Sequence, residues 1–300
     1  MIRWKNAPKI TGRGLVRYNT SRFEMNYEKI VREVIEEHRS SPVDMLSTGD
    51  QTGEYNYLSS HLDSYVRTVR DLDQLLGGNK SRRILEIGSF LGPVSISLRQ
   101  MGYDVSAVDI PEFHQSDRLR ALYSRHCVDY RSANLRHHKL PYDSGAFDAV
   151  IICEVIEHFN FNPLPVILEI NRILKTGGHI YVGMPNQTFI VNRIRLLQGK
   201  STQGNVEEFF QQLDRDSNMI VGLHWREYTM AETCEMLSRM GFRLERSYFF
   251  NEGASLKANP LKALLRAIVY AYPPFRPYQV AIAEKITFPT YDFWLTEANS

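Results

Sequence analysis

The sequence lacks the features that would place it in several large classes of protein. Its three cysteines form no C-x-x-C pair, and their odd number argues against a disulfide framework. Lys and Arg total 36 against 34 Asp and Glu, so the net charge of +2 offers no electrostatic footprint for nucleic acid. No apolar run approaches the length of a membrane span, and the opening residues MIRWKNAPKITGRG contain no secretory apolar stretch. By elimination we expect a cytoplasmic protein that binds no nucleic acid.

What is present is enough apolar sequence for one elaborated domain. The chain has 300 residues, of which 43% are hydrophobic, and such a chain buries a substantial core. We predict a helical N-terminal cap over residues 1–80 and a core domain over residues 81–300. Residues 187–222 and 251–277 are too long for ordinary connections of about 2–6 residues, so we predict that both are insertions.

The most informative segment is ILEIGSFLGPVSISLRQMGYDVSAVD, residues 84–109. It predicts a buried strand, a turn at Gly88, a helix that begins after Gly92, and a second strand that ends at Asp109. Gly88 permits a sharp turn, and the free N–H groups of the helix face whatever lies over that turn. An acidic side chain about twenty residues past the first glycine can hold two ribose hydroxyls. The segment therefore predicts a nucleoside-binding crevice.

The glycine pattern separates two classes of nucleoside cofactor. A dinucleotide site requires G-x-G-x-x-G, because the pyrophosphate needs close approach of the backbone. Here Phe90 replaces the middle glycine, no third glycine follows Gly92, and Glu86 lies two residues before the first glycine. The pattern disfavours a nicotinamide-dependent oxidoreductase of similar fold, which is one alternative. A cofactor-binding scaffold without turnover is another, because Phe90 narrows the loop.

A second informative block is FDAVIICEVIEHF, residues 147–159. Its apolar half predicts a fully buried strand. Glu154, Glu157 and His158 follow at positions i, i+3 and i+4, so one helical turn would place the three side chains on a common face. A helix with an apolar stripe and another buried strand come next.

Together the two blocks resemble class I S-adenosylmethionine-dependent methyltransferases, of the type that includes ubiquinone-pathway and polysaccharide O-methylating enzymes. The resemblance covers residues 83–186 and resumes at residues 224–242, in HWREYTMAETCEMLSRMGF. It implies an α/β, Rossmann-like, doubly wound and mostly parallel seven-stranded sheet. Residues 278–286 are the candidate for its antiparallel seventh strand.

The resemblance also implies roles for individual residues. Asp109 would hold the ribose, Ile110 would lie against adenine, and Glu86 would border the methionine moiety with the glycines. The positions expected to contact the cofactor are Glu86, Gly88, Ser89, Gly92, Asp109, Ile110, Asn134, Leu135, Cys153 and Glu154.

The implied reaction is methyl transfer from S-adenosyl-L-methionine. We predict a hydroxyl acceptor on a small molecule, a sugar or a lipid-linked intermediate, because CEVIEHF lacks the N-P-P-Y-like motif common in methylation of planar nitrogens. His158 is the leading candidate for the general base that removes the hydroxyl proton, with Glu157 and His224 in reserve. A purely structural role for His158, holding the loop beneath the cofactor, is equally open.

A metal site is a further alternative to the favoured metal-free reaction. Two carboxylates and two imidazoles, from Glu154, Glu157, His158 and His224, would suit Mg²⁺ or Mn²⁺ better than structural Zn²⁺. Some relatives with E-x-x-E-H are thought to bind a divalent metal in this way.

The second insertion contains an amphipathic stretch, residues 257–274. Its apolar residues recur at helical spacing, with Lys257, Lys262 and Arg266 nearby. We predict a lid helix that packs its apolar face over the substrate cleft. Peripheral contact with an anionic membrane is the alternative.

Overall fold

The computed structural model describes residues 26–40, 53–203, 206, 210, 223–252 and 260–289. Part of the predicted cap (residues 1–25 and 41–52) and parts of both predicted insertions (most of residues 204–222, and residues 253–259) lie outside the described residues.

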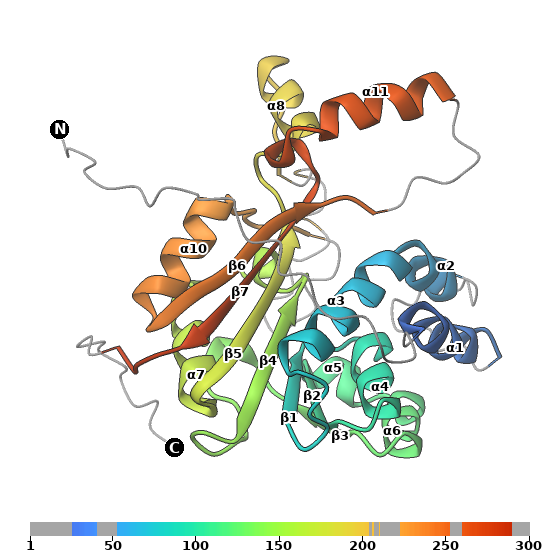
Figure 1. Cartoon of the computed structure of the whole chain (residues 1–300), viewed down its shortest axis with the longest axis vertical. Helices are drawn as coiled ribbons and strands as arrows, with labels where there is room; N and C mark the ends of the chain where they lie inside the picture. The colour runs from blue at the N-terminus through green and yellow to red at the C-terminus, as the bar shows by residue number, and fades with distance from the viewer. Residues whose placement is uncertain are drawn as a thin grey trace.

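A mostly parallel sheet forms the centre of the described chain (Figure 1). Its strands lie in the order β3-β2-β1-β4-β5-β7-β6. Strands β1 to β5 run parallel, whereas β7 is antiparallel to both β5 and β6. The bounds are β1 Arg83–Ile87, β2 Asp104–Asp109, β3 Asp129–Ser132, β4 Phe147–Cys153, β5 Leu174–Pro185, β6 Phe242–Phe250 and β7 Tyr278–Lys285. The predicted doubly wound fold and its antiparallel seventh strand are confirmed.

The central strands are apolar because both faces of the sheet are covered. Successive side chains of a strand point to opposite faces. Ile84 and Ile151 accordingly pack in one core cluster, and Leu85 and Val150 pack in the other. All four side chains are fully buried, as expected for a parallel sheet between two layers of helices.

Helices that are adjacent in the chain cover each face. One face packs against α1 Tyr27–Ser40, α3 Leu62–Leu75, α4 Pro93–Gln100, α5 Pro111–His114 and α6 Asp117–Arg125, and the other packs against α7 Leu164–Ile173 and α10 Met230–Arg239. Within the predicted helical cap, α3 is preceded by a shorter helix, α2 Gly53–Ser60, and the two are separated at His61. The Ser60 hydroxyl and the His61 ring both bond the Tyr57 carbonyl, and such local bonds compete with a continuous helix.

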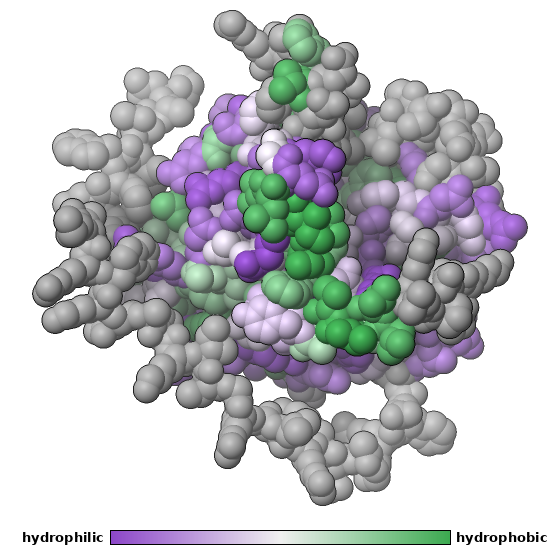
Figure 2. All heavy atoms as spheres, turned by 90° about the horizontal axis from the view of Figure 1, so that it is seen from above, coloured by the Kyte–Doolittle hydropathy of each residue, from purple (hydrophilic) through white to green (hydrophobic). Residues whose placement is uncertain are grey.

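Two helices extend beyond the carboxyl ends of the strands (Figure 1). They are α8 Ile190–Leu197 and α11 Pro260–Tyr270, one from each predicted insertion. Figure 2, which views the molecule from this end, shows hydrophobic residues gathered on this side between hydrophilic ones. Within the described residues, no helix has the length and apolar character needed to cross a bilayer.

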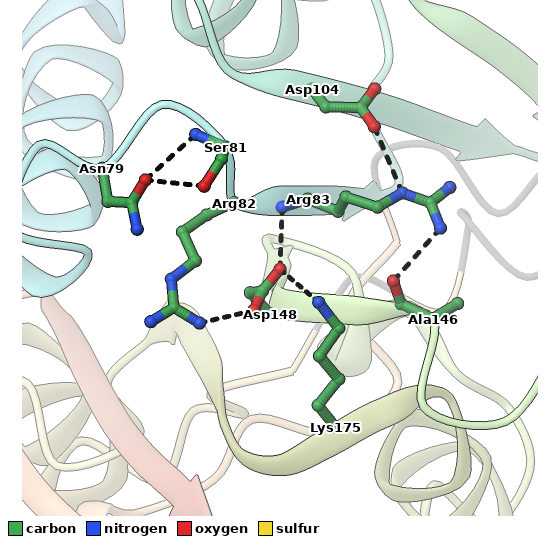
Figure 3. A network of polar contacts seen from close by, with 8 residues as sticks. All are labelled: Asn79, Ser81, Arg82, Arg83, Asp104, Ala146, Asp148 and Lys175. Atoms are coloured by element: carbon green, nitrogen blue, oxygen red, sulfur yellow. Dashed lines mark hydrogen bonds and ion pairs between the residues drawn. The ribbon is translucent and has the colours of Figure 1, made fainter.

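At the opposite end of the strands, Asp148 ties β1 to β4 and β5 (Figure 3). Its carboxylate accepts hydrogen bonds from Arg82 Nη1 at 2.7 Å and from Lys175 Nζ at 2.8 Å. The backbone N–H of Arg83 is a third donor, at 2.9 Å. Burial alone would raise the pKa of Asp148, but these donors outweigh burial and lower it to about 2.

Candidate active site

A cavity of about 700 Å³ lies where the carboxyl ends of β1, β2 and β4 meet. In an open α/β sheet this edge, at the point where the strand order reverses, is where ligands bind. Most residues predicted from the sequence line it, namely Glu86, Gly88, Ser89, Asp109, Ile110, Asn134, Leu135, Cys153, Glu154, His158 and His224. Gly92 and Glu157 are not part of its lining.

The two glycines of the first turn have structural reasons to be glycine. Gly88 has φ +72°, and a Cβ there would lie 2.3 Å from Val155 Cγ2. Gly92 has φ +80° and caps α4, and a Cβ there would lie 2.9 Å from Ile96 Cδ1. Both glycines therefore shape the turn.

Phe90 keeps the left-handed backbone that a glycine would adopt at its position. Its φ is +47°, which for an aromatic residue is a strained conformation. The Phe90 N–H donates to Asp109 Oδ2 at 2.6 Å, and the carbonyl accepts from Tyr123 Oη at 3.1 Å. The ring lies 5.3 Å from that of Phe113 and 5.9 Å from that of Tyr57, so it joins α5 to α2 while lining the cavity.

Asp109 is the acidic group at the centre of this part of the cavity. It is 8% exposed, and its Oδ1 accepts a hydrogen bond from the Ile110 N–H at 2.8 Å. Burial raises the pKa of Asp109 to about 6, against the lowering effect of its backbone donors. Each carboxylate oxygen can accept more than one hydrogen bond, so both oxygens of Asp109 can still accept a hydrogen bond from a ligand hydroxyl.

Glu86 lies behind the glycine turn and is also buried. It accepts a hydrogen bond from the Ser95 hydroxyl. Burial raises the pKa of Glu86 to about 8, so the carboxyl is largely protonated at neutral pH.

Asn134 also lines the cavity. Its Oδ1 accepts a hydrogen bond from the Arg136 N–H at 3.1 Å, and Asn134 thereby caps a 3-10 turn, Leu135–His137.

The segment after β4 differs from the predicted helical turn. Glu154 has φ +53° and stands outside the 3-10 turn, which comprises only Ile156–His158. The predicted single helical turn from Glu154 to His158 therefore does not form, although the carboxyls of Glu154 and Glu157 still lie within hydrogen-bonding reach of each other. Ligand atoms of Glu157, His158 and His224 lie within 4.8 Å of one another.

The two histidines are held by their Nδ1 atoms. His158 Nδ1 lies 2.9 Å from the Leu223 carbonyl oxygen, and His224 Nδ1 lies 3.2 Å from Glu227 Oε1. The rings meet edge to face, with centroids 4.9 Å apart. A carbonyl oxygen can only accept, so His158 Nδ1 carries a proton, and in the neutral ring Nε2 is the basic nitrogen.

Two carboxyls adjoin these imidazoles. Glu157 is fully buried, and its backbone carbonyl accepts from the Trp225 N–H at 2.8 Å, which ties the turn to the loop carrying His224. Burial, and then the negative charge of Glu154, raise the pKa of Glu157 well above its usual range. Burial also raises the pKa of Glu154 to about 7.

Part of the chain matches a known protein family. A family model described as a methyltransferase domain matches residues 85–182, the stretch from β1 to β5 that builds most of this cavity. The chain carries a class I S-adenosylmethionine-dependent methyltransferase domain.

Curated relatives of this methyltransferase domain agree with the match. The ubiquinone biosynthesis O-methyltransferase of Xanthomonas oryzae is 35% identical over 107 residues, which cover 35% of this chain and 44% of that protein. The protein of the same name from Xanthomonas campestris is 34% identical over a segment of the same length and coverage. The chain thus spans less than half the length of these relatives.

A solved structure shares the fold of the chain. A SAM-dependent methyltransferase from Archaeoglobus fulgidus superimposes with a TM-score of 0.50 at 17% identity, covering 77% of this chain and all of that one. The cofactor of this class is S-adenosylmethionine. The cavity has groups of the kind that this cofactor needs, namely a buried carboxylate, which can accept hydrogen bonds from ribose hydroxyls, and a close backbone turn.

One wall of the cavity, contributed by the N-terminal helices, was not among the residues predicted from the sequence. Tyr57, His61 and Tyr65 line the cavity from α2 and α3, and Arg67 lines it with its guanidinium 3.3 Å from the centre of the Phe250 ring. Their spacing of about one helical turn was a signal in the sequence, but nothing there fixed which way that face pointed. The predicted lid, residues 257–274, lies partly outside the described residues, and no described residue of α11 lines the cavity.

Proposed function

We propose that this chain transfers a methyl group from S-adenosylmethionine to a hydroxyl of a small acceptor. The observation that carries the proposal is the position of His158, which lines the same cavity as Asp109 and presents a basic nitrogen there. The names of the curated relatives support an oxygen acceptor, as does the absence of an N-P-P-Y-like motif after β4.

The cofactor supplies an electrophilic methyl group on a sulfonium. Asp109 and the glycine turn orient the nucleoside. The Glu154 carboxyl, whose pKa burial raises to about 7, is partly ionised at neutral pH and faces the same cavity, where it can attract a cationic ligand. His158 Nε2 takes the acceptor's proton, while the Leu223 carbonyl holds the ring in the required tautomer. His224 is positioned in the same way by Glu227 and serves as a second proton acceptor. The chain thus mainly supplies orientation and proton removal.

We further propose that residues 1–80 act as a cap and residues 81–300 as the catalytic core. Contacts of α2 support the cap, because Tyr57 touches Phe90 of the glycine turn. The buried His38 ring of α1, whose Nε2 lies 2.9 Å from the Leu91 carbonyl oxygen, adds a second contact to the same loop. The aromatic wall that results suits an aromatic or otherwise apolar acceptor better than a free sugar.

A metal-assisted reaction is the second candidate, and the grouping of Glu157, His158 and His224 is the observation in its favour. Two imidazoles and one carboxylate would suit Mn²⁺ or a similar transition ion better than Mg²⁺. In that case the metal would polarise the acceptor hydroxyl and lower its pKa.

The test is methyl transfer from isotopically labelled S-adenosylmethionine to a panel of phenolic, catecholic and sugar acceptors. We expect the wild-type chain to transfer the methyl group to a hydroxyl acceptor, and His158→Ala to lose most of this activity. The control His137→Ala, whose side chain is exposed, should keep the wild-type activity. Loss of activity with chelator and its return with Mn²⁺ would favour the metal candidate. Cofactor binding without transfer to any acceptor in the panel would favour a non-catalytic scaffold.

A further inference from the structure

Large aliphatic side chains are exposed on α8 and α11. On α8, Leu196 is 62% and Leu197 is 89% exposed, and on α11, Leu264 is 58% and Ile268 is 63% exposed. Val191, Ile194, Leu265 and Tyr272 are also exposed on this side. Such a cluster differs from the scattered apolar residues that any surface carries.

The bases of the two helices are joined, so their apolar residues belong to one surface. Asn186, before α8, donates to the Pro274 carbonyl at 2.9 Å and to the Arg276 carbonyl at 2.7 Å. The rings of Phe189 and Tyr270 lie 6.2 Å apart, and the Arg193 guanidinium lies 5.4 Å from the centre of the Phe275 ring. We call the surface formed by Ile190–Leu197 and Pro260–Tyr270 the distal face.

The charge of the distal face has one sign. The helix sequences IVNRIRLL and PLKALLRAIVY contain basic residues and no Asp or Glu. Arg193 and Arg195 donate to the carbonyls of Thr188 and Ser201, each at 2.8 Å. Arg266 likewise donates to the Glu252 carbonyl, at 3.0 Å.

The positive charge of these arginines is not compensated by a carboxylate among the described residues. Within the described part of the chain, none of the three forms an ion pair with a carboxylate, whereas Arg125, Arg131 and Arg239 elsewhere do. A carbonyl partner fixes the direction of a guanidinium without neutralising it.

We propose that the distal face docks on the surface of an anionic lipid bilayer. Its exposed leucines and isoleucines would enter the boundary between headgroups and acyl chains, while its arginines meet lipid phosphates. Uncompensated positive charge beside aliphatic residues favours this partner over a neutral protein surface. The aliphatic residues favour it over nucleic acid, which offers them no apolar phase.

Docking would bring the cavity to the membrane. Phe189 and Asn192, at the start of α8, line the cavity as well as supporting the distal face. An acceptor with an apolar tail could then keep the tail in the bilayer while its reactive end enters the cavity. This delivery of a membrane-bound acceptor to the cavity rests on the proposed methyl transfer. The proposal that the distal face docks on a membrane does not.

The test is flotation of the full chain with vesicles of phosphatidylcholine, with and without phosphatidylglycerol. We expect binding to the anionic vesicles that weakens with salt, and little binding to the neutral ones. The double variant Leu197→Ser/Ile268→Ser should bind at least about tenfold more weakly, because two aliphatic side chains are lost from the interface. Arg193→Gln/Arg195→Gln should also weaken binding, by about fivefold for each charge removed.

The matched control is Leu244→Ser, which removes a leucine that is 41% exposed on β6 and should leave flotation unchanged. Unchanged affinity for S-adenosylhomocysteine and an unchanged thermal midpoint would show that each variant is folded. A wild-type chain that ignores anionic vesicles would overturn the proposal. A dimer seen by light scattering and dissolved by Leu197→Ser/Ile268→Ser would also overturn it, because a second copy would then cover the distal face.

Discussion

Replacing Asp109 with alanine should weaken binding of S-adenosylhomocysteine by at least tenfold. The carboxylate is expected to accept a charge-assisted hydrogen bond from each ribose hydroxyl, and each such bond contributes about 1.5–3 kcal/mol. The observed loss will be smaller than the sum, because Asp109 also holds the N–H groups of Phe90 and Ile110. Tenfold, or about 1.4 kcal/mol, is therefore the lower limit.

The pH dependence provides a second measure of the same contact. Because burial raises the pKa of Asp109 to about 6, the carboxylate is charged above that pH and protonated below it. Ribose hydroxyls stabilise the charged form, so affinity should fall as the pH drops below about 6, by up to about tenfold per pH unit. Comparison with Asp109→Asn isolates this effect, since Glu86, with a pKa raised to about 8, titrates in both proteins.

The assay is calorimetry with S-adenosylhomocysteine and with its 2′-deoxyribose analogue. The wild type should lose affinity for the analogue, whereas Asp109→Ala should bind both ligands equally weakly, as a double-mutant cycle requires. Asp104→Ala is the matched control, because Asp104 lies at the other end of β2 and its side chain is 62% exposed. Unchanged affinity in Asp109→Ala would refute the assignment of the ribose site.

Three further substitutions test other parts of the account. His158→Ala should lower turnover on the order of 10²–10⁴-fold while sparing cofactor affinity, and chelator should leave the wild-type rate unchanged; lost cofactor affinity would instead indicate a structural His158. Asp148→Asn should lower the free energy of unfolding by about 2 kcal/mol at neutral pH, since the pKa falls from 3.8 to about 2 on folding. That difference should shrink as the pH falls from about 4 to 2 in acid-denaturation curves, because a depressed pKa stabilises only the ionised form. Gly88→Ala should lower the free energy of unfolding by about 2 kcal/mol or more, because its Cβ meets Val155; the control Gly145→Ala, with φ +66° and no atom within 4 Å, should cost about 1 kcal/mol in urea titrations.

The alternation of strands and helices along the chain and the place of the cavity were predictable from local pattern. Gly88, Asp109 and Cys153 each mark the point where an apolar run gives way to a turn, and parallel strands bring such points to one edge. The resemblance to known methyltransferases added the antiparallel β7, which no periodicity in the sequence indicates. The positive φ of Phe90 was not predicted, although the glycine at that position in the family pattern was a signal for it.

The misses concern features decided by tertiary contacts. Spacing alone placed Glu154 on a helical turn, but the strand ends in a left-handed residue that spacing does not reveal. An amphipathic pattern shows that the apolar face of α11 should be covered, but not by what. The sequence therefore could not distinguish a lid from the distal face. The cavity-lining residues of α2 and α3 were missed for a similar reason, since Tyr57 and Tyr65 resemble ordinary packing residues in the sequence.

A crystal structure of the chain with S-adenosylhomocysteine tests the central claim most directly. We expect ribose hydroxyls bonded to Asp109, adenine beside Ile110, and the sulfur directed toward the part of the cavity bounded by His158 and His224. A ligand bound elsewhere, or bound in this cavity with its sulfur directed away from both histidines, would contradict the assignment of the site.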